Sequence, residues 1–583
     1  MQKYLLTLMS MIMASTLTVK AQSWCEDLVK LNPDVIDSVC LLKEKDLYVS
    51  DVTSYMIHYH QPLKHDAPEL GSLPLRAFFT INTANHGGEL MDKMIQMSIG
   101  GYELSDKAMH TPNKYLSEDA FENSNGEIAY EYSSHLLMPE HRYFGFSFPE
   151  GAYRYKTLGY CEAKEAAADF HALAEAMKKV FHGKWCISGV SKGGIATVVQ
   201  HAYYPDDADF FVPYVAPFMN GRNDMRAQEH WMSKPWTPEM REHILHIQKE
   251  ILHRPAVYEY YHKQNFEEEG LTEDLFRCKF LYKVAKYFAG KCMLETRSQV
   301  SQDIEGNMKY LKDKGLEDYS DLMLTYMFMC QGQISLSNGF EYWCENTYKG
   351  NSESNNVSSV RKLPQASAAI AKSGAEPVFG LNYGDWKSDT DAAFAYQTAH
   401  ELGYYGLKWD YFYDTQAEID AVNTLWKNNV KSVIDLDTYD VLKDVEYDPS
   451  LRNFVLQQVK KATKPMIFIY GGDDMWNGIQ IEDEYINGDN VRKYILQEKN
   501  HAACLTTLAS EIEPEEVQKQ KKEIWDILRA VFLPQYAGIT ETTDNKPQTT
   551  GIYNLSGCRI PQLQKGINIV KMSNGTTKKV RVK

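Results

Sequence analysis

The chain has 583 residues and a formal net charge of −16, with 44% hydrophobic and 24% charged residues. This length allows one large domain with insertions or two to three domains, and the composition is ordinary for a globular protein. The negative charge argues against binding to nucleic acids or to anionic membranes.

The first 21 residues have the three-part pattern of an export signal. Lys3 precedes an apolar stretch from Tyr4 to Met13, and small residues lead up to a cleavage site after Ala21. The alternative is a buried N-terminal helix. No later segment has the roughly 18 apolar residues that span a bilayer. We therefore expect an exported protein without a transmembrane segment, in the periplasm, at the cell surface or outside the cell.

Ten cysteines in an exported chain predict disulfide bonds. We expect one between Cys25 and Cys40, which flank a short segment near the mature N-terminus. No two cysteines have the close spacing of a zinc site, so the sequence predicts no metal and no cofactor. Up to two further disulfides are expected among four cysteines of one region: Cys278, Cys292, Cys330 and Cys344.

In the first half of the chain, helical and strand patterns alternate, whereas residues 22–60 show no clear period. This alternation predicts an α/β fold with a parallel sheet covered on both faces. The expected strands are 73–82, 133–139, 184–190 and 209–218, and the expected helices are 160–181 and 193–204.

From about residue 220 the sequence is helical and rich in aromatic residues, and strand patterns return only near residue 464. We interpret residues 220–400 as a helical cap inserted into a sheet domain, although an independent helical domain is the alternative. The other expected segments are a signal peptide (1–21), the two parts of the sheet domain (22–219 and 401–535), a polar linker (536–550) and a C-terminal β segment (551–583).

The sequence GVSKG at residues 189–193 fits the motif G-x-S-x-G between a strand and a helix. Its glycines permit a sharp turn that presents the hydroxyl of Ser191 at the end of the strand. The alternative is a glycine-rich turn with an incidental serine, whereas phosphate-binding patterns are absent. Such a serine needs a base that takes its proton and an acid that orients the base.

Candidate partners follow in the chain order Ser, Asp, His that α/β hydrolases use. Asp474 follows the strand "MIFIY" and His501 follows the strand "VRKYIL". Both are therefore expected at the carboxyl ends of strands, where such sheets hold their active sites. Asp473 is the rival acid. We predict Ser191 as nucleophile, His501 as base and Asp474 as acid.

A developing oxyanion needs backbone N–H donors. The first is expected at Lys192, which follows the nucleophile at the start of a helix. For the second, the loop "PEHRYFG" at 139–145 offers an N–H near Arg142 or Tyr143, and we take Tyr143. The alternative is that His141 and Arg142 are structural, as members of a salt-bridged loop.

Several segments resemble the S37 family of serine aminopeptidases, which are secreted bacterial enzymes and distant relatives of the S28 family. They include "EHRYFGFSFP", "GVSKGG", "YYPDDADFFVPYVAPF", "FAYQTAHELGYY", "YGGDDMW" and "NHAACL". The resemblance spans about Tyr48 to Leu533. It implies an α/β-hydrolase domain with a helical cap, and release of tripeptides or dipeptides, with or without proline, from the free N-terminus of short peptides.

The same motif match assigns Ser191, Asp474 and His501 the roles derived above. Relatives often have a proline where this chain has Met475. The tail from Gly551 resembles the C-terminal β segments of exported proteins that use type IX secretion, although a plain surface tail is equally allowed.

An aminopeptidase needs a carboxylate that holds the ammonium group of its substrate. Glu401 is the candidate, and Gln397, one helical turn earlier, is expected to share a face with it. A capping or surface role is the alternative for Glu401. The same triad would serve an esterase or acyl-hydrolase, and a catalytically silent binding protein is a third possibility.

Overall fold

The computed structural model describes the chain in two compact units, residues 1–525 and 526–583. The predicted export signal lies outside the described residues. Within the described part of the chain, no helix combines the length and apolarity that a membrane span requires. The residues not described are 1–23, 44–51, 84–88, 105–125, 149–156, 314–320, 330–388, 434–444, 507–512, 534–548, 555–558, 561–565, 573–576 and 583.

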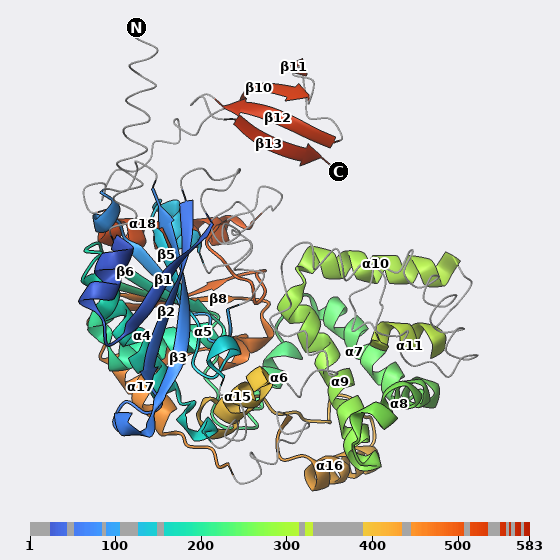
Figure 1. Ribbon diagram of the computed structural model, residues 1–583. Coiled ribbons are helices and arrows are strands. Elements are labelled where there is room, and N and C mark those ends of the chain that lie inside the picture. Colours follow the sequence, from blue (N-terminus) through green and yellow to red (C-terminus); the bar gives the residue numbers. More distant parts are fainter. Residues whose placement is uncertain are drawn as a thin grey trace. The chain divides into compact units, whose positions relative to one another are not determined.

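A nine-stranded sheet forms the centre of the first unit, in the order β1-β2-β3-β5-β4-β6-β7-β8-β9 (Figure 1). The first three strands, β1 (Ile36–Lys43), β2 (Val52–Pro62) and β3 (Ser72–Asn82), run antiparallel to their neighbours. The remaining six pair in parallel. They are β4 (Ile95–Ser98), β5 (His135–Pro139), β6 (Trp185–Val190), β7 (Phe210–Tyr214), β8 (Met466–Gly471) and β9 (Val491–Leu496).

The parallel strands lie inside the hydrophobic core, because helices pack against the sheet. All six residues of β8, with the sequence MIFIYG, are buried, as expected for a strand covered on both faces. Helix α4 buries Phe170, Leu173 and Met177 in the same core cluster. Helices of this part are α4 (Ala163–Lys178), α5 (Lys192–Tyr203) and α17 (Ser450–Lys460), and α18 (Glu515–Phe532) begins in it.

The parallel sheet and its strands β5 to β9 confirm the sequence analysis, whereas β1, β2 and β4 were not predicted. Strand β4 is only four residues long, and two of them, Gln96 and Ser98, are polar. The amide of Gln96 is fully buried and satisfied on both sides. Its Nε2 donates to Ser188 Oγ at 2.8 Å, and its Oε1 accepts from Ala129 N at 2.7 Å. These polar residues hide a central strand from any search for apolar runs.

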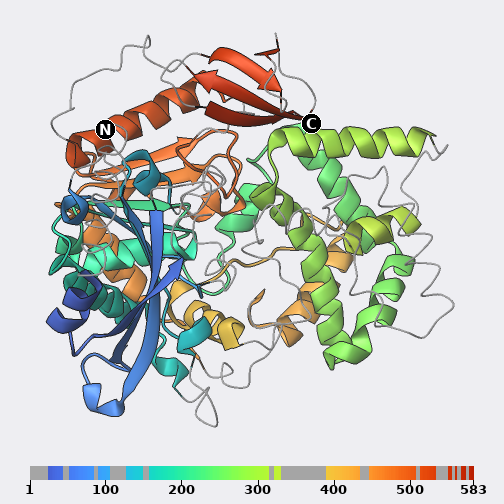
Figure 2. The same ribbon diagram turned by 45° about the horizontal axis from the view of Figure 1, so that its top comes forward.

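The segment between β7 and β8 forms a helical cap around its own aromatic core (Figures 1 and 2). Its helices begin at recognisable signals. Thr237 caps α7, whose first residue is Pro238, and Pro255 begins α8, which ends at the left-handed Gly270. The cap helices are α6 (Arg226–Trp231), α7 (Pro238–Leu252), α8 (Pro255–Glu269), α9 (Glu273–Leu294), α10 (Arg297–Asp313) and α11 (Asp321–Met329).

The cap extends beyond residue 400, where we expected it to end. Trp409, Phe412 and Val430 belong to the aromatic core of the cap, and α16 (Gln416–Asn429) lies in the same part of the chain. Helix α15 (Asp389–Gln397), by contrast, places Ala392 and Ala393 in the core of the sheet domain. Residues 389–433 therefore contribute to both cores, with α15 in the core of the sheet domain and residues 409–430 in that of the cap.

The expected disulfide between Cys25 and Cys40 is wrong, because Cys40 is a free thiol and the two sulfur atoms are not bonded. Cys40 is exposed on β1, whereas Cys25 is half-buried. Cys278 is also free, and its burial raises the pKa of the thiol to about 12. Cys330 and Cys344 lie outside the described residues, as does the side chain of Cys292.

The second unit contains a four-stranded antiparallel sheet in the order β11-β10-β12-β13. It coincides with the β segment expected from residue 551. The strands are β10 (Thr549–Asn554), β11 (Arg559–Ile560), β12 (Gly566–Met572) and β13 (Thr577–Val582).

The loop after β5 is fixed by the buried guanidinium of Arg142. Its Nε and Nη2 atoms donate to the two carboxylate oxygens of Asp169 on α4, at 2.7 and 2.6 Å. The remaining N–H groups reach the carbonyl oxygens of Pro62, Leu63 and Tyr160. Arg142 is thus the structural, salt-bridged residue that the sequence analysis kept as an alternative.

We expect Asp169→Asn to lower the free energy of unfolding by about 3–5 kcal/mol, because it removes the carboxylate that accepts two hydrogen bonds from buried Arg142 and leaves only that of Glu165, 4.0 Å away. The change is measured as a shift of the urea or thermal unfolding midpoint. Asp313→Asn removes an exposed partner of Lys309 and serves as the control, with an expected effect below about 0.5 kcal/mol. Equal effects of the two substitutions would contradict this account.

Candidate active site

Ser191 lies at the sharp turn between β6 and α5, in a backbone conformation that residues other than glycine rarely adopt. Its φ and ψ angles are 57° and −117°. Such a backbone costs about 1–3 kcal/mol and persists only where the surroundings enforce it. Here the N–H of Ser191 donates to Tyr214 O at the end of β7, at 2.9 Å. The turn therefore has the geometry that G-x-S-x-G motifs adopt in α/β hydrolases.

The glycines of the motif are required by close packing. A Cβ atom at Gly193 would lie 2.0 Å from the carbonyl oxygen of Ile99, and one at Gly189 would lie 2.3 Å from Gly193 O. Real Cβ atoms do not approach backbone oxygens this closely. The turn thus fits directly against the chain that leaves β4.

Asp474 and His501 form a buried hydrogen-bonded pair. His501 Nδ1 lies 2.7 Å from Asp474 Oδ2, and Asp474 Oδ1 accepts a hydrogen bond from Trp476 N at 3.0 Å. Because Nδ1 is hydrogen-bonded to Asp474, Nε2 is the ring nitrogen that remains for proton transfer. Among the described residues it has no hydrogen-bond partner. Asp474 follows β8 and His501 follows β9, so both lie at the edge of the sheet that also carries Ser191 after β6.

Asp473, the rival acid, has a different contact. Its carboxylate accepts two hydrogen bonds from Arg297 at the start of α10, at 2.7 and 3.0 Å, and a third from Trp236 N at 3.0 Å. Asp473 therefore joins the loop after β8 to the cap, while Asp474 orients the histidine.

The cap also contacts the histidine loop and the acid loop directly. The N–H of His501 donates to Met293 O in α9, at 3.3 Å. The short helix η14 (Met475–Ile479) packs against α6, where a Cβ at Gly478 would lie 2.5 Å from the Cβ of His230. An aromatic ring also lies beside the imidazole, since the ring centroids of Trp476 and His501 are 6.5 Å apart.

The first oxyanion donor is available at the start of α5, where Lys192 is the first helical residue. Tyr143, our second choice, follows β5, has a φ of 65° and is buried, with its ring against Phe148. A different loop touches the serine turn. A Cβ at Gly101, in the loop after β4, would lie 2.9 Å from Gly193 N. In α/β hydrolases the second donor comes from a separate loop that follows an inner strand, and this arrangement favours the β4 loop over Tyr143.

The carboxylate of Glu401 has a structural contact. Its Oε1 accepts a hydrogen bond from Ala163 N at 2.7 Å and so caps the first turn of α4. Burial raises the pKa of the Glu401 carboxyl to about 8. Both observations favour the capping role over an anchor for an ammonium group. In Gln397, which is fully buried, neither polar atom of the amide has a hydrogen-bond partner in the described part of the chain.

The sequence analysis missed Glu127, a buried residue of α3 (Glu127–Glu131) that supports the histidine loop. Its carboxylate accepts hydrogen bonds from Leu505 N at 2.9 Å and from both the N–H and the hydroxyl of Thr506, at 2.9 and 3.0 Å. It also accepts from the hydroxyl of Tyr214 at 2.6 Å. Because Tyr214 O holds the N–H of Ser191, Glu127 connects the histidine loop to the serine turn. No sequence motif marks this residue.

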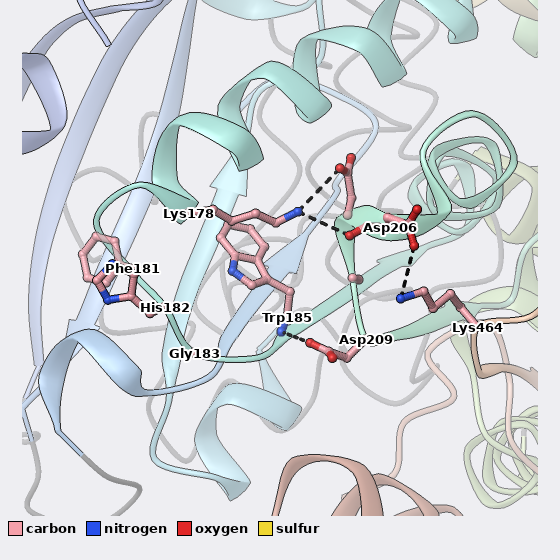
Figure 3. Close-up of a pocket in the computed structure, with 10 residues that line it drawn as sticks. Lys178, Phe181, His182, Gly183, Trp185, Asp206, Asp209 and Lys464 are labelled. Carbon is pink, nitrogen blue, oxygen red and sulfur yellow. Dashed lines mark hydrogen bonds and ion pairs between the residues drawn. The ribbon is translucent and has the colours of Figure 1, made fainter. Parts of the chain in front are cut away.

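A cavity of about 450 Å³ lies at the other edge of the sheet, where β6 and β7 begin. Figure 3 shows the residues that line it, among them Lys178 and Lys464, with Lys464 paired with Asp206. Among the described residues, one group could hold a metal ion, namely His171, Glu175 and Asp207 beside this cavity. Lys178 pairs with Glu175 at 2.9 Å and with Asp207 at 3.7 Å, so these two carboxylates already have a cationic partner. Ser191, Asp474 and His501 do not line this cavity.

The sheet order, the strained serine turn and the buried Asp–His pair define an α/β hydrolase, as predicted. The PS-10 peptidase S37 family matches residues 35–284. The prolyl tri/tetrapeptidyl aminopeptidase of Streptomyces mobaraensis is 28% identical over 213 residues, which are 36% of this chain and 39% of that protein. Both matches agree with the motifs and support the predicted assignment to the S37 family.

Solved structures of other hydrolases also match, at low similarity. A proline iminopeptidase of Mycobacterium smegmatis has a TM-score of 0.30 and 10% identity, covering 79% of this chain and 97% of that one. The esterase LipA of Xanthomonas oryzae has a TM-score of 0.34 and 9% identity, covering 86% and 99%. The assignment of the fold rests on the sheet and the serine turn.

We expect Glu127→Gln to lower kcat about tenfold, because an amide N–H₂ would face hydrogen-bond donors and loosen the histidine loop. Peptide hydrolysis and the thermal unfolding midpoint would be measured together. Glu523→Gln is the matched control, since the exposed Glu523 on α18 accepts a similar hydrogen bond, from the hydroxyl of Tyr494 at 2.6 Å. A Glu127 variant with unchanged kcat would remove this residue from the support of the site.

Proposed function

We propose that the chain is a serine exopeptidase that releases tripeptides or dipeptides from the free N-terminus of short peptides. The observation that carries the proposal is the buried contact of His501 with Asp474 at the sheet edge where the strained turn presents Ser191. The S37 match and the aminopeptidase relative support peptides as substrates. The export signal expected in residues 1–21 supports action outside the cytoplasm.

The proposed reaction proceeds through an acyl-enzyme. Ser191 Oγ attacks the scissile carbonyl carbon as its proton moves to His501 Nε2, and Asp474 holds the imidazole in the required tautomer. Backbone N–H groups of Lys192 and of the β4 loop stabilise the oxyanion. His501 then gives the proton to the leaving amine. Water, deprotonated by His501, releases the N-terminal fragment and restores the serine.

The cap is the part of the chain that would select short peptides. It contacts the acid loop through Asp473 and the histidine loop through Met293, so it lies over the edge of the sheet that carries the triad. Aromatic rings gather there, including Tyr404, Tyr405 and Trp476. Flat, rigid walls of this kind suit proline and other compact side chains.

Gln397 is our candidate for contact with the substrate amine. It follows Phe394 by three residues on α15, and the ring of Phe394 lies 5.8 Å from Tyr102 in the β4 loop. That spacing places Gln397 on the helix face directed at this loop. Its amide oxygen is buried and has no partner among the described residues, so a substrate ammonium group that reached it would supply the missing hydrogen bond.

Mass spectrometry of the products from a defined peptide mixture tests the proposed function. We expect Ser191→Ala and Asp474→Asn to lower kcat by about four orders of magnitude, since each removes one function of the triad. Asp473→Asn is the matched control and should lose no more than about tenfold, because it weakens a contact of the cap. Equal losses at both aspartates would contradict the assignment of the acid.

The same protein samples, assayed with acyl esters, distinguish a peptidase from the alternative, an esterase. An esterase would hydrolyse acetyl and longer acyl esters and leave peptides with a free amine intact. Failure of Ser191 to react with a fluorophosphonate probe would instead point to a silent binding protein.

We expect Gln397→Leu to raise KM about tenfold to a hundredfold with little change in kcat, since a hydrogen bond to a charged group is worth about 1.5–3 kcal/mol. Inhibition by the tripeptide product, with and without an N-acetyl group, identifies the contact. The variant should lose affinity for the free amine only. Equal loss for both peptides would show that Gln397 does not bind the amine.

A further inference from the structure

Lys192 follows the nucleophile directly, and its long side chain is buried, with 5% exposed. The ammonium group donates a hydrogen bond to the carbonyl oxygen of Gly101. It lies 4.2 Å from the ring centroid of Phe144 and 5.0 Å from that of Tyr102. Contacts of a cation with aromatic faces are worth more when, as here, water is excluded.

These contacts join the two segments that surround the proposed oxyanion site. The backbone of Lys192 belongs to the serine turn, whereas Gly101 and Tyr102 belong to the loop after β4. The C=O and N–H of one peptide group lie in a common plane. A hydrogen bond to Gly101 O therefore fixes the orientation of the whole peptide group between Gly101 and Tyr102, and with it the path of the loop.

We propose that Lys192 is a positioning residue: its ammonium holds the β4 loop against the serine turn, so that the loop keeps a backbone N–H aimed at the oxyanion. The proposal rests on the function proposed above and adds a role for a side chain that takes no part in the triad. One residue then contributes twice, through its own backbone N–H and through the loop that its side chain fixes.

The chemistry of the buried amine suits this role. Burial lowers the pKa of Lys192 to about 7, although Cys161, Glu401 and Glu103 act in the opposite direction. A neutral amine still carries N–H groups, so the hydrogen bond to Gly101 is available in both protonation states. A buried lysine that only filled space would be replaced without loss by methionine, which has a similar length and no donor.

The first test compares Lys192→Met with Lys178→Met in the full-length protein. Lys178 also lies over an aromatic ring, that of Trp185 at 5.8 Å, but at the other edge of the sheet. We expect Lys192→Met to lower kcat about a hundredfold to a thousandfold, as loss of an oxyanion donor does, with KM changed less than about twofold. Lys178→Met should leave both constants unchanged.

Two inhibitors separate positioning from a general loss of structure. A peptide aldehyde forms a hemiacetal with Ser191 whose oxygen occupies the oxyanion site, whereas the peptide product does not. Affinity for the aldehyde should fall by the same factor as kcat/KM in Lys192→Met, while affinity for the product stays constant. An unchanged kcat, or equal weakening of both inhibitors, would overturn the proposal.

A second variant keeps the test valid if Lys192→Met does not fold. Gly101→Ala retains the lysine but adds a Cβ at 2.9 Å from Gly193 N, at a residue whose φ is 78°. We expect the same selective loss of kcat and aldehyde affinity. Gly270→Ala is the control, because Gly270 has a similar φ of 63° and open space around it. If the wild-type protein cleaves no peptide, the proposed function is wrong. If the wild type cleaves peptides and both Lys192→Met and Gly101→Ala are as active as the wild type, the proposed role of Lys192 is wrong.

Discussion

The contact between the serine turn and the end of β4 is the constraint on which the site depends. Gly193 and Gly189 lie so close to neighbouring backbone oxygens that no side chain fits at either position. This packing enforces the backbone angles of Ser191 and brings the β4 loop next to the first turn of α5. The proposed nucleophile and the proposed oxyanion donors are therefore positioned by the same few contacts, before any substrate is present.

Much of this architecture could be predicted from the sequence. Strands β6 to β8 are largely apolar runs bounded by turns, whereas β9, with the sequence VRKYIL, contains two cationic residues. The residues that follow β6, β8 and β9 include Ser191, Asp474 and His501. Motif and chain order led to the prediction of these three residues as a triad. The contact of His501 with Asp474 and of Arg297 with Asp473 then distinguishes two adjacent aspartates that the sequence could rank only by position.

The residues that sequence reasoning missed have a common physical cause. Strand β4 is short, and Gln96 and Ser98 interrupt its apolar pattern, so its loop was overlooked and Tyr143 was chosen as the second donor. The partners of Glu127 lie more than 80 residues away along the chain, and no local pattern reports such contacts. The Cys25–Cys40 pair shows the opposite error, since proximity in sequence suggested a bond that the fold does not make.

The backbone hydrogen bond from His501 to Met293, together with the Asp473–Arg297 pair, makes the cap part of the scaffold of the proposed triad. Lifting α9 and α10 to admit a peptide would withdraw support from the base and from the loop of its acid at the same time. Peptide-bond cleavage would then be slow while the cap is raised and would recover when α9 and α10 return to these contacts. Under the proposed function, the rate of bond cleavage and the selection of peptides by length would then depend on the same contacts of the cap.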